Sequence, residues 1–86
     1  MRTENEIFVE LKKIIAKQLD VDEKLITKES SFTNDLEADS LDVVELIMVF
    51  EERFDLSIED DVAGQMVTVG DVLYYILEEQ YYDLED

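Results

Sequence analysis

The sequence contains no cysteine, no histidine, no tryptophan and no proline, and it has only two glycines. Without cysteine and histidine, the chain cannot form a disulfide framework, a Cys/His zinc site or a catalytic centre that needs a Cys nucleophile or a His base. Because residues that break helices are so few, the sequence favours helices over a fold of strands and turns. A standalone enzyme is therefore nearly excluded.

Basic residues are scarce in most of the chain. Residues 1–28 hold six basic and six acidic side chains, whereas residues 29–86 hold eighteen acids and only Arg53, so this second segment carries the whole net charge of −17. Such a surface repels nucleic acid and anionic membranes and attracts basic surfaces of partner proteins. The alternative is that the acids simply confer solubility.

Long apolar runs are also absent. The longest run, 46–50, is far too short to span a bilayer, and the first residues lack the basic and then apolar pattern of a signal peptide. We therefore expect a soluble cytoplasmic protein, without membrane insertion and monomeric. A chain of 86 residues with 47% hydrophobic residues predicts a single domain over 1–86.

Capping signals and helical periodicity predict an all-α fold, a small four-helix bundle with a long first crossover loop and a short third helix. Thr3 and Glu6 form a capping-box pattern that begins a helix ending near Gln18 or Leu19. The crossover at 20–39 has no sustained periodicity. The apolar face of the first helix comprises Ile7, Leu11, Ile14 and Ile15. The residues expected to anchor the crossover are Leu25, Ile26, Phe32 and Leu36.

The second half of the chain predicts three further helices. One runs over about 40–54, with Asp39 as its N-cap and Asp42 completing an acidic capping box. A short helical piece follows at about 59–64, and the last helix begins after Thr68, which can cap it. We expect the tail at 80–86 to fray. The apolar face of the last helix comprises Val69, Val72, Leu73 and Ile76.

The helix over 40–54 carries two apolar stripes. At about 100° per residue, the first stripe spans about 100° of arc and predicts the core contact, and the second is centred roughly 130° away. A one-core bundle needs one stripe per helix, so the second, rimmed by acids, predicts a docking surface. The alternative is that Leu41 and Val44 pack under the crossover. The core stripe comprises Val43, Leu46, Ile47, Phe50 and Phe54, and the second stripe comprises Leu41, Val44 and Met48.

Ser40 lies in the first turn of this helix. Serines at this position are usually only caps, but a helix N-terminus offers free N–H groups and a positive dipole end that suit a phosphate esterified to the hydroxyl. The chain supplies no base to activate Ser40, because it lacks histidine and its lysines at 24 and 28 lie in the crossover. If Ser40 reacts, another enzyme must activate it.

These residues closely resemble those of a known family. The sequence DLEADSLD at residues 35–42, followed by Val44-Glu45-Leu46 and by EERF at 51–54, resembles the acyl carrier proteins of type II (dissociated) fatty acid synthesis. The resemblance extends over about 7–76 and includes Ser31-Phe32 and Thr68-Val69. It departs at Glu37, where the family usually has glycine, and at Asp20 and Glu59, where glycine and proline are common.

The resemblance implies that Ser40 carries 4′-phosphopantetheine, transferred from coenzyme A by a magnesium-dependent phosphopantetheinyl transferase. The arm's thiol would hold acyl groups as thioesters for fatty acid synthesis. The other implied partners are the basic patches of ketoacyl synthases, reductases, dehydratases and acyltransferases. The implied partner face comprises Asp39, Leu41, Asp42, Val44, Glu45, Met48, Glu51, Glu52, Asp60, Asp61 and Met66, and the implied acyl-chain cavity is lined by Leu46, Phe50, Ile58, Ala63 and Leu73.

Two further interpretations remain open at this point. One is a non-catalytic acidic interaction domain, including a carrier homologue that serves as a subunit of another assembly with Ser40 unmodified. The other is a divalent-cation protein, given acid clusters such as that at 59–61, although no EF-hand pattern is present and we predict no specific metal site.

Overall fold

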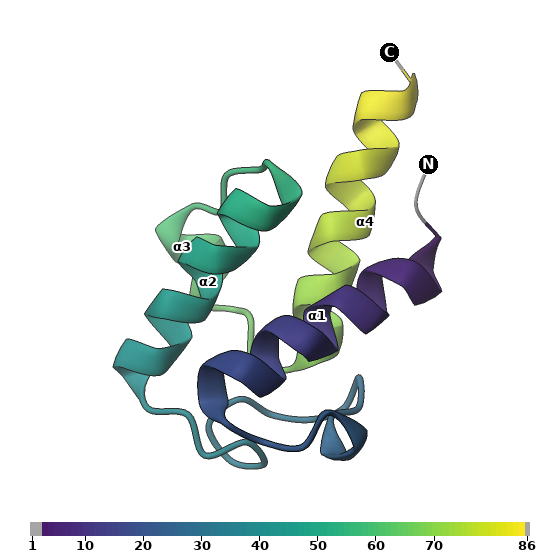
Figure 1. Cartoon of the computed structure of the whole chain (residues 1–86). Coiled ribbons are helices and arrows are strands. Elements are labelled where there is room, and N and C mark those ends of the chain that lie inside the picture. Colours follow the sequence, from purple (N-terminus) through teal and green to yellow (C-terminus); the bar gives the residue numbers. More distant parts are fainter. Residues whose placement is uncertain (1–2, 86) are drawn as a thin grey trace.

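The computed structural model describes the backbone of residues 3–85 and the side chains of residues 3–79. Within this part of the chain lie α1 (Glu4–Leu19), a 3₁₀ turn (Glu23–Leu25), α2 (Ser40–Phe54), α3 (Asp60–Ala63) and α4 (Val69–Glu85). The predicted all-α fold, with its long crossover and short third helix, is confirmed. In Figure 1, α2 and α3 lie on one side of the molecule and α4 on the other, and α1 contacts both α2 and α4.

Capping begins and ends α1 at the predicted residues. The Thr3 side chain accepts from the Glu6 N–H, and the Glu6 side chain accepts from the Thr3 N–H. At the other end, Asp20 takes the left-handed conformation with φ of 57°, and its N–H donates to the carbonyl of Ala16. All four residues predicted for the apolar face are buried. The sequence signals therefore predicted both the limits and the orientation of α1.

The crossover is anchored largely as predicted, with one correction. Ile26, Phe32 and Leu36 are buried, but Leu25 is 71% exposed. Leu25 ends the 3₁₀ turn and Ile26 follows in extended backbone. The structure turns Ile26 inward and leaves Leu25 in solvent. The prediction that Leu25 anchors the crossover is wrong.

Backbone hydrogen bonds tie the crossover to the start of α4. Phe32 N–H donates to the carbonyl of Val67 at 3.0 Å, and Val69 N–H donates to that of Ser30 at 3.0 Å. Ser31 and Thr68 form an isolated antiparallel bridge. Gly70 N–H donates to the carbonyl of Lys28 at 2.8 Å, and a Cβ on Gly70 would lie only 2.9 Å from that oxygen. Glycine is needed here because the two backbones approach so closely.

One buried cluster joins all four helices and the crossover. Phe50, Leu46 and Leu73 are among the largest side chains that are fully buried. Each such side chain stabilises the fold by about 1.5–3 kcal/mol relative to an exposed position. The predicted apolar face of α4 is buried in the same cluster.

Thr68 caps α4, with its Oγ1 accepting from the Asp71 N–H at 3.2 Å, as predicted.

The C-terminal part of the chain extends α4. The helical backbone continues to Glu85. Side chains from residue 80 onwards and residue 86 as a whole lie outside the described part, so the fraying expected for 80–86 stays a prediction.

Candidate functional site

Ser40 is the first residue of α2, and Asp39 is its N-cap. The capping box is complete, since Asp42 N–H donates to Asp39 Oδ1 at 2.8 Å and Asp39 N–H donates to Asp42 Oδ2 at 3.2 Å. Capping therefore does not depend on the Ser40 hydroxyl. Ser40 is exposed, and its hydroxyl has no hydrogen-bond partner among residues 3–79, whose side chains are described. The amides of Ser40 and Leu41 have no acceptor within the helix.

This arrangement fits a phosphate ester. The Ser40 oxygen is open to solvent and to another enzyme. Two free amides and the positive end of the helix dipole lie beside it, and both favour a bound anion. The chain offers no base next to the hydroxyl, because it contains no histidine and the neighbouring side chains Asp39 and Asp42 are used in the capping box. The residues present can hold phosphopantetheine but cannot attach it themselves.

The turn that delivers the chain to Ser40 has a strained residue. Glu37 takes φ of 57°, in the left-handed region, and its side chain is exposed. Ala38, which follows, is buried, and its N–H donates to the carbonyl of Phe32 at 2.8 Å. The departure at Glu37, where the family that the sequence resembles usually has glycine, raises the question whether this turn needs a positive φ. The structure answers that it does, with glutamate where glycine would be unstrained.

We expect Glu37→Gly to stabilise the fold by about 1 kcal/mol, because glycine adopts this conformation without the steric cost of a Cβ. A urea titration would detect the change as a shift of the unfolding midpoint. Glu29→Gly is the matched control, since Glu29 is an exposed loop acid with a negative φ. If both variants changed the midpoint equally, the gain would come from the lost charge and not from the backbone.

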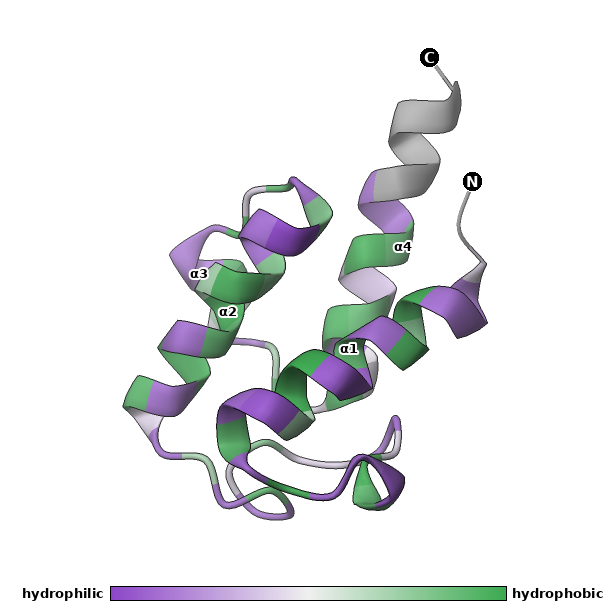
Figure 2. Ribbon diagram, in the orientation of Figure 1, coloured by the Kyte–Doolittle hydropathy of each residue, from purple (hydrophilic) through white to green (hydrophobic). Residues whose placement is uncertain are grey.

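The second apolar stripe of α2 is exposed. Leu41, Val44 and Met48 have exposed fractions of 65%, 54% and 56%. The alternative in which Leu41 and Val44 pack under the crossover is therefore wrong. In the core stripe Leu46, Ile47, Phe50 and Phe54 are buried and Val43 is half-buried. Figure 2 shows hydrophobic and hydrophilic segments alternating along α2. We call Leu41, Val44 and Met48 the α2 strip.

The acids predicted for the partner face differ in their exposure and in their hydrogen bonds. Glu45, Glu52, Asp60 and Asp61 are exposed, whereas Asp42 and Glu51 are half-buried. Glu45 Oε2 accepts from Gln18 Nε2 at 3.3 Å. Glu51 has a structural contact as well, since its Oε2 accepts from the Ile58 N–H at 2.8 Å.

Met66 is the exception among the residues predicted for this face. It was expected to extend the surface from the short third helix. It lies beyond α3, which ends at Ala63, and its side chain is only 7% exposed. The chain after α3 turns Met66 into the core cluster. The prediction that Met66 belongs to the exposed face is wrong.

A groove of about 340 Å³ lies between α2 and α3. It is bordered by Val43, Val44, Ile47 and Met48 of α2, Glu51, Ile58 of the following loop, and Asp60, Ala63 and Gly64. Of the five residues predicted to line an acyl-chain cavity, Ile58 and Ala63 line this groove. Leu46 and Phe50 are core residues with 1% and 0% exposure.

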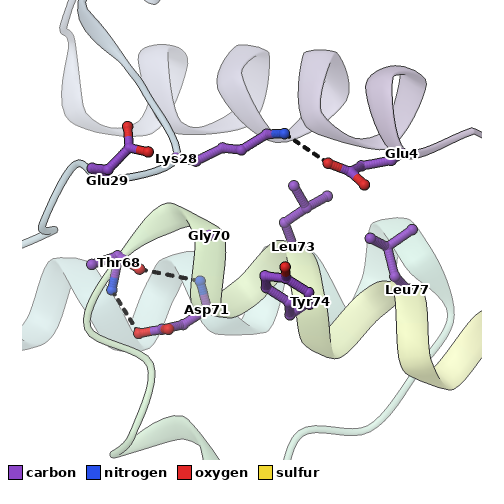
Figure 3. A pocket seen from close by; sticks show the side chains of 9 residues that line it. All are labelled: Glu4, Lys28, Glu29, Thr68, Gly70, Asp71, Leu73, Tyr74 and Leu77. Atoms are coloured by element: carbon purple, nitrogen blue, oxygen red, sulfur yellow. Dashed lines mark hydrogen bonds and ion pairs between the residues drawn. The ribbon is translucent and has the colours of Figure 1, made fainter.

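Leu73 borders a different pocket, on the face formed by α4, the start of α1 and the crossover (Figure 3). This pocket of about 300 Å³ contains the ion pair between Lys28 Nζ and Glu4 Oε2, at 2.6 Å, and Asp71 bonded to Thr68. The hydrogen bond to Glu4 raises the pKa of Lys28. The structure thus distributes the five predicted cavity residues over the groove, the core and this second pocket, and the shared acyl-chain cavity stays a prediction.

The sequence did not reveal how the loop between α2 and α3 is held. Tyr75 Oη donates to the carbonyl of Ser57 at 2.8 Å, while Glu51 accepts from the N–H of the same peptide group, which is that of Ile58. Burial raises the pKa of Tyr75, and the charges of Glu79, Glu59 and Glu51 add to this effect, which further favours the protonated hydroxyl that donates this bond. The sequence does show a tyrosine, Tyr75, beside the core positions of α4, but the residue spacing does not identify the acceptor of its hydroxyl.

Among residues 3–79, whose side chains the structure describes, no three acidic side chains are grouped so that they could hold a metal ion. The same described residues contain no helix that is long and apolar enough to cross a membrane.

Comparison with known proteins gives one consistent result. The family model described as "Phosphopantetheine attachment site" matches residues 9–76. The acyl carrier protein of Picosynechococcus sp. is 55% identical over 73 residues, covering 85% of this chain and 90% of that protein. The acyl carrier protein of Karelsulcia muelleri is 54% identical over 72 residues, covering 84% and 87%.

A solved structure supports the same assignment. It comes from work on the high thermal stability of acyl carrier protein from Enterococcus faecalis, and it matches with a TM-score of 0.76 and 31% identity over 90% of this chain and 98% of the other. A helical domain with a phosphopantetheine attachment site defines a class of carrier proteins, which are substrates of enzymes and not catalysts. Within that class, this chain belongs to the acyl carrier protein family.

Proposed function

We propose that Ser40 is the residue that carries the phosphopantetheine arm and that the α2 strip with its acids is the face read by the enzymes of type II fatty acid synthesis. The observation that carries the proposal is the exposed, unbonded Ser40 hydroxyl at the tip of a helix whose cap does not need it. The matched family is the one whose members carry this arm.

In this reaction the chain presents the Ser40 hydroxyl to the transferase and does not activate it. The Ser40 oxygen forms the bond to the phosphorus that bears the pantetheine, the phosphoanhydride of coenzyme A breaks, and adenosine 3′,5′-bisphosphate leaves. The serine proton passes to the transferase, because this chain has no base beside the hydroxyl. The bound arm supplies a thiol for acyl thioesters, which this cysteine-free chain lacks. The free amides of Ser40 and Leu41 stabilise the phosphodiester.

The partner face combines apolar contact with charge. Leu41, Val44 and Met48 offer exposed area for affinity, and exposed acids such as Glu45 and Glu52 steer basic surfaces toward Ser40. Transferase, ketoacyl synthases, reductases, dehydratases and acyltransferases would all dock here in turn. Asp60 and Asp61 extend the same acidic field next to the groove. We place the protein in the cytoplasm as a monomeric domain that meets these enzymes one at a time.

Reversal of charge on this face should weaken docking. We expect Glu45→Lys combined with Glu52→Lys to reduce affinity for a type II ketoacyl synthase by about 10- to 100-fold, mainly through slower association. Helicity should persist, because both side chains are exposed and, among the described residues, the only hydrogen bond lost is the one from Gln18. Titration calorimetry and circular dichroism give the two readouts.

The control for this variant reverses two acids elsewhere. Glu78→Lys combined with Glu79→Lys changes the net charge equally on α4, where both residues are exposed. If the control weakened binding as much as the test variant, affinity would depend on net charge and not on this face.

Loading tests the proposed function directly. Incubation with coenzyme A, magnesium and a broad-specificity phosphopantetheinyl transferase should raise the intact mass by one phosphopantetheine group. An unchanged mass, with a transferase that loads a known carrier in parallel, would instead favour a carrier homologue that acts as an assembly subunit with Ser40 unmodified.

A further inference from the structure

The α2–α3 groove begins close to Ser40. Val43 and Val44 border it and lie three and four residues after Ser40, about one helical turn away. Its volume of about 340 Å³ is at the lower end of the range for small-molecule sites. Most of its border is apolar, and Ile58 lines it from the loop between α2 and α3. An apolar chain attached at Ser40 that entered the groove would contact Ile58.

Ile58 owes its position to the peptide group that joins it to Ser57, which is held at both ends from two different helices. From α2, Glu51 Oε2 accepts from the Ile58 N–H at 2.8 Å. From α4, Tyr75 Oη donates to the Ser57 carbonyl at 2.8 Å. Before these bonds the chain leaves α2 through Asp55, which takes the left-handed conformation. The Ile58 side chain is 7% exposed.

We propose that Glu51 and Tyr75 are positioning residues that hold Ile58 over the groove and thereby set how readily it takes the apolar part of an acyl group carried on Ser40. The inference rests on the function proposed above for Ser40. Neither Glu51 nor Tyr75 needs to touch the acyl group for this role, since each acts through its hydrogen bond to the backbone of residues 57 and 58. Loss of either bond frees one side of the loop, and the helices on both sides keep their caps and core contacts.

Hydrogen exchange in the unloaded protein tests the positioning itself. Tyr75→Phe and Glu51→Ala should each speed exchange of the Ile58 amide by about two- to tenfold relative to the Phe50 amide, in line with the usual contribution of one hydrogen bond. Glu51→Gln keeps an acceptor oxygen and should restore much of the protection. Loss of global stability alone would speed both amides together, and that result would overturn the proposal.

Acyl loading tests the consequence for the groove. The wild type and Tyr75→Phe are loaded from octanoyl coenzyme A and from acetyl coenzyme A, and cleavage of each thioester by hydroxylamine is timed. We expect a severalfold faster cleavage of the octanoyl thioester in Tyr75→Phe, and equal rates for acetyl, which is too short to enter the groove. Equal octanoyl rates in a loaded protein would overturn the inference and leave the carrier function intact. Failure of the wild type to load would contradict the carrier function, while the exchange experiment would still decide the roles of Glu51 and Tyr75.

Discussion

Ser40→Ala is expected to abolish loading with phosphopantetheine completely. The transferred phosphorus bonds to the serine oxygen, and alanine has none. The variant should fold normally because Asp39 and Asp42, and not Ser40, form the capping box of α2. Intact mass after incubation with coenzyme A and transferase measures the loss, and circular dichroism measures the fold.

A second hydroxyl provides the control for this experiment. Ser57 is also exposed, and it takes part in its hydrogen bond with Tyr75 through the backbone carbonyl, which an alanine keeps. We expect Ser57→Ala to load like the wild type. Loading of Ser40→Ala, or failure of Ser57→Ala to load, would show that the position of the acceptor hydroxyl has been misjudged.

Phe50→Ala is expected to lower the free energy of unfolding by about 3–5 kcal/mol, because truncation of a buried aromatic ring loses its transfer free energy and leaves a cavity. Phe50 is 0% exposed and lies in the cluster that joins the helices and the crossover. Since small domains have only about 5–15 kcal/mol of stability in total, this variant should be largely or partly unfolded at elevated temperature. Urea unfolding followed by circular dichroism measures the change.

Met48→Ala is the matched control on the same helix. Met48 is 56% exposed on the α2 strip, so its truncation should change the free energy of unfolding by less than about 0.5 kcal/mol. Equal destabilisation by the two variants would contradict the distinction between the buried stripe of α2 and the exposed one.

The two stripes of α2 show how much of this protein the sequence predicts. Local signals determine a helix's ends and its faces, so Thr3 with Glu6 and Asp39 with Asp42 marked the starts of α1 and α2 correctly. Periodicity then separated Phe50 from Met48, and the structure gives these residues opposite exposure. The exposed hydroxyl of Ser40 followed from its place in the first turn.

Contacts between distant segments could not be predicted in this way. Leu25 lies in a three-residue 3₁₀ turn and Met66 lies beyond α3. Periodicity does not say which way a side chain points in such short or irregular segments, and both predictions about them were wrong. Leu73 was correctly placed on the buried face of α4, but the face alone does not reveal which pocket it borders. The bond from Tyr75 to Ser57 joins residues eighteen positions apart through a loop without a regular pattern.

The most direct test of the central claim is to locate the added group on the loaded wild-type protein by fragmentation in the mass spectrometer. The account predicts one phosphopantetheine group, on Ser40, in the peptide that contains the start of α2. A group found on any other hydroxyl would contradict it.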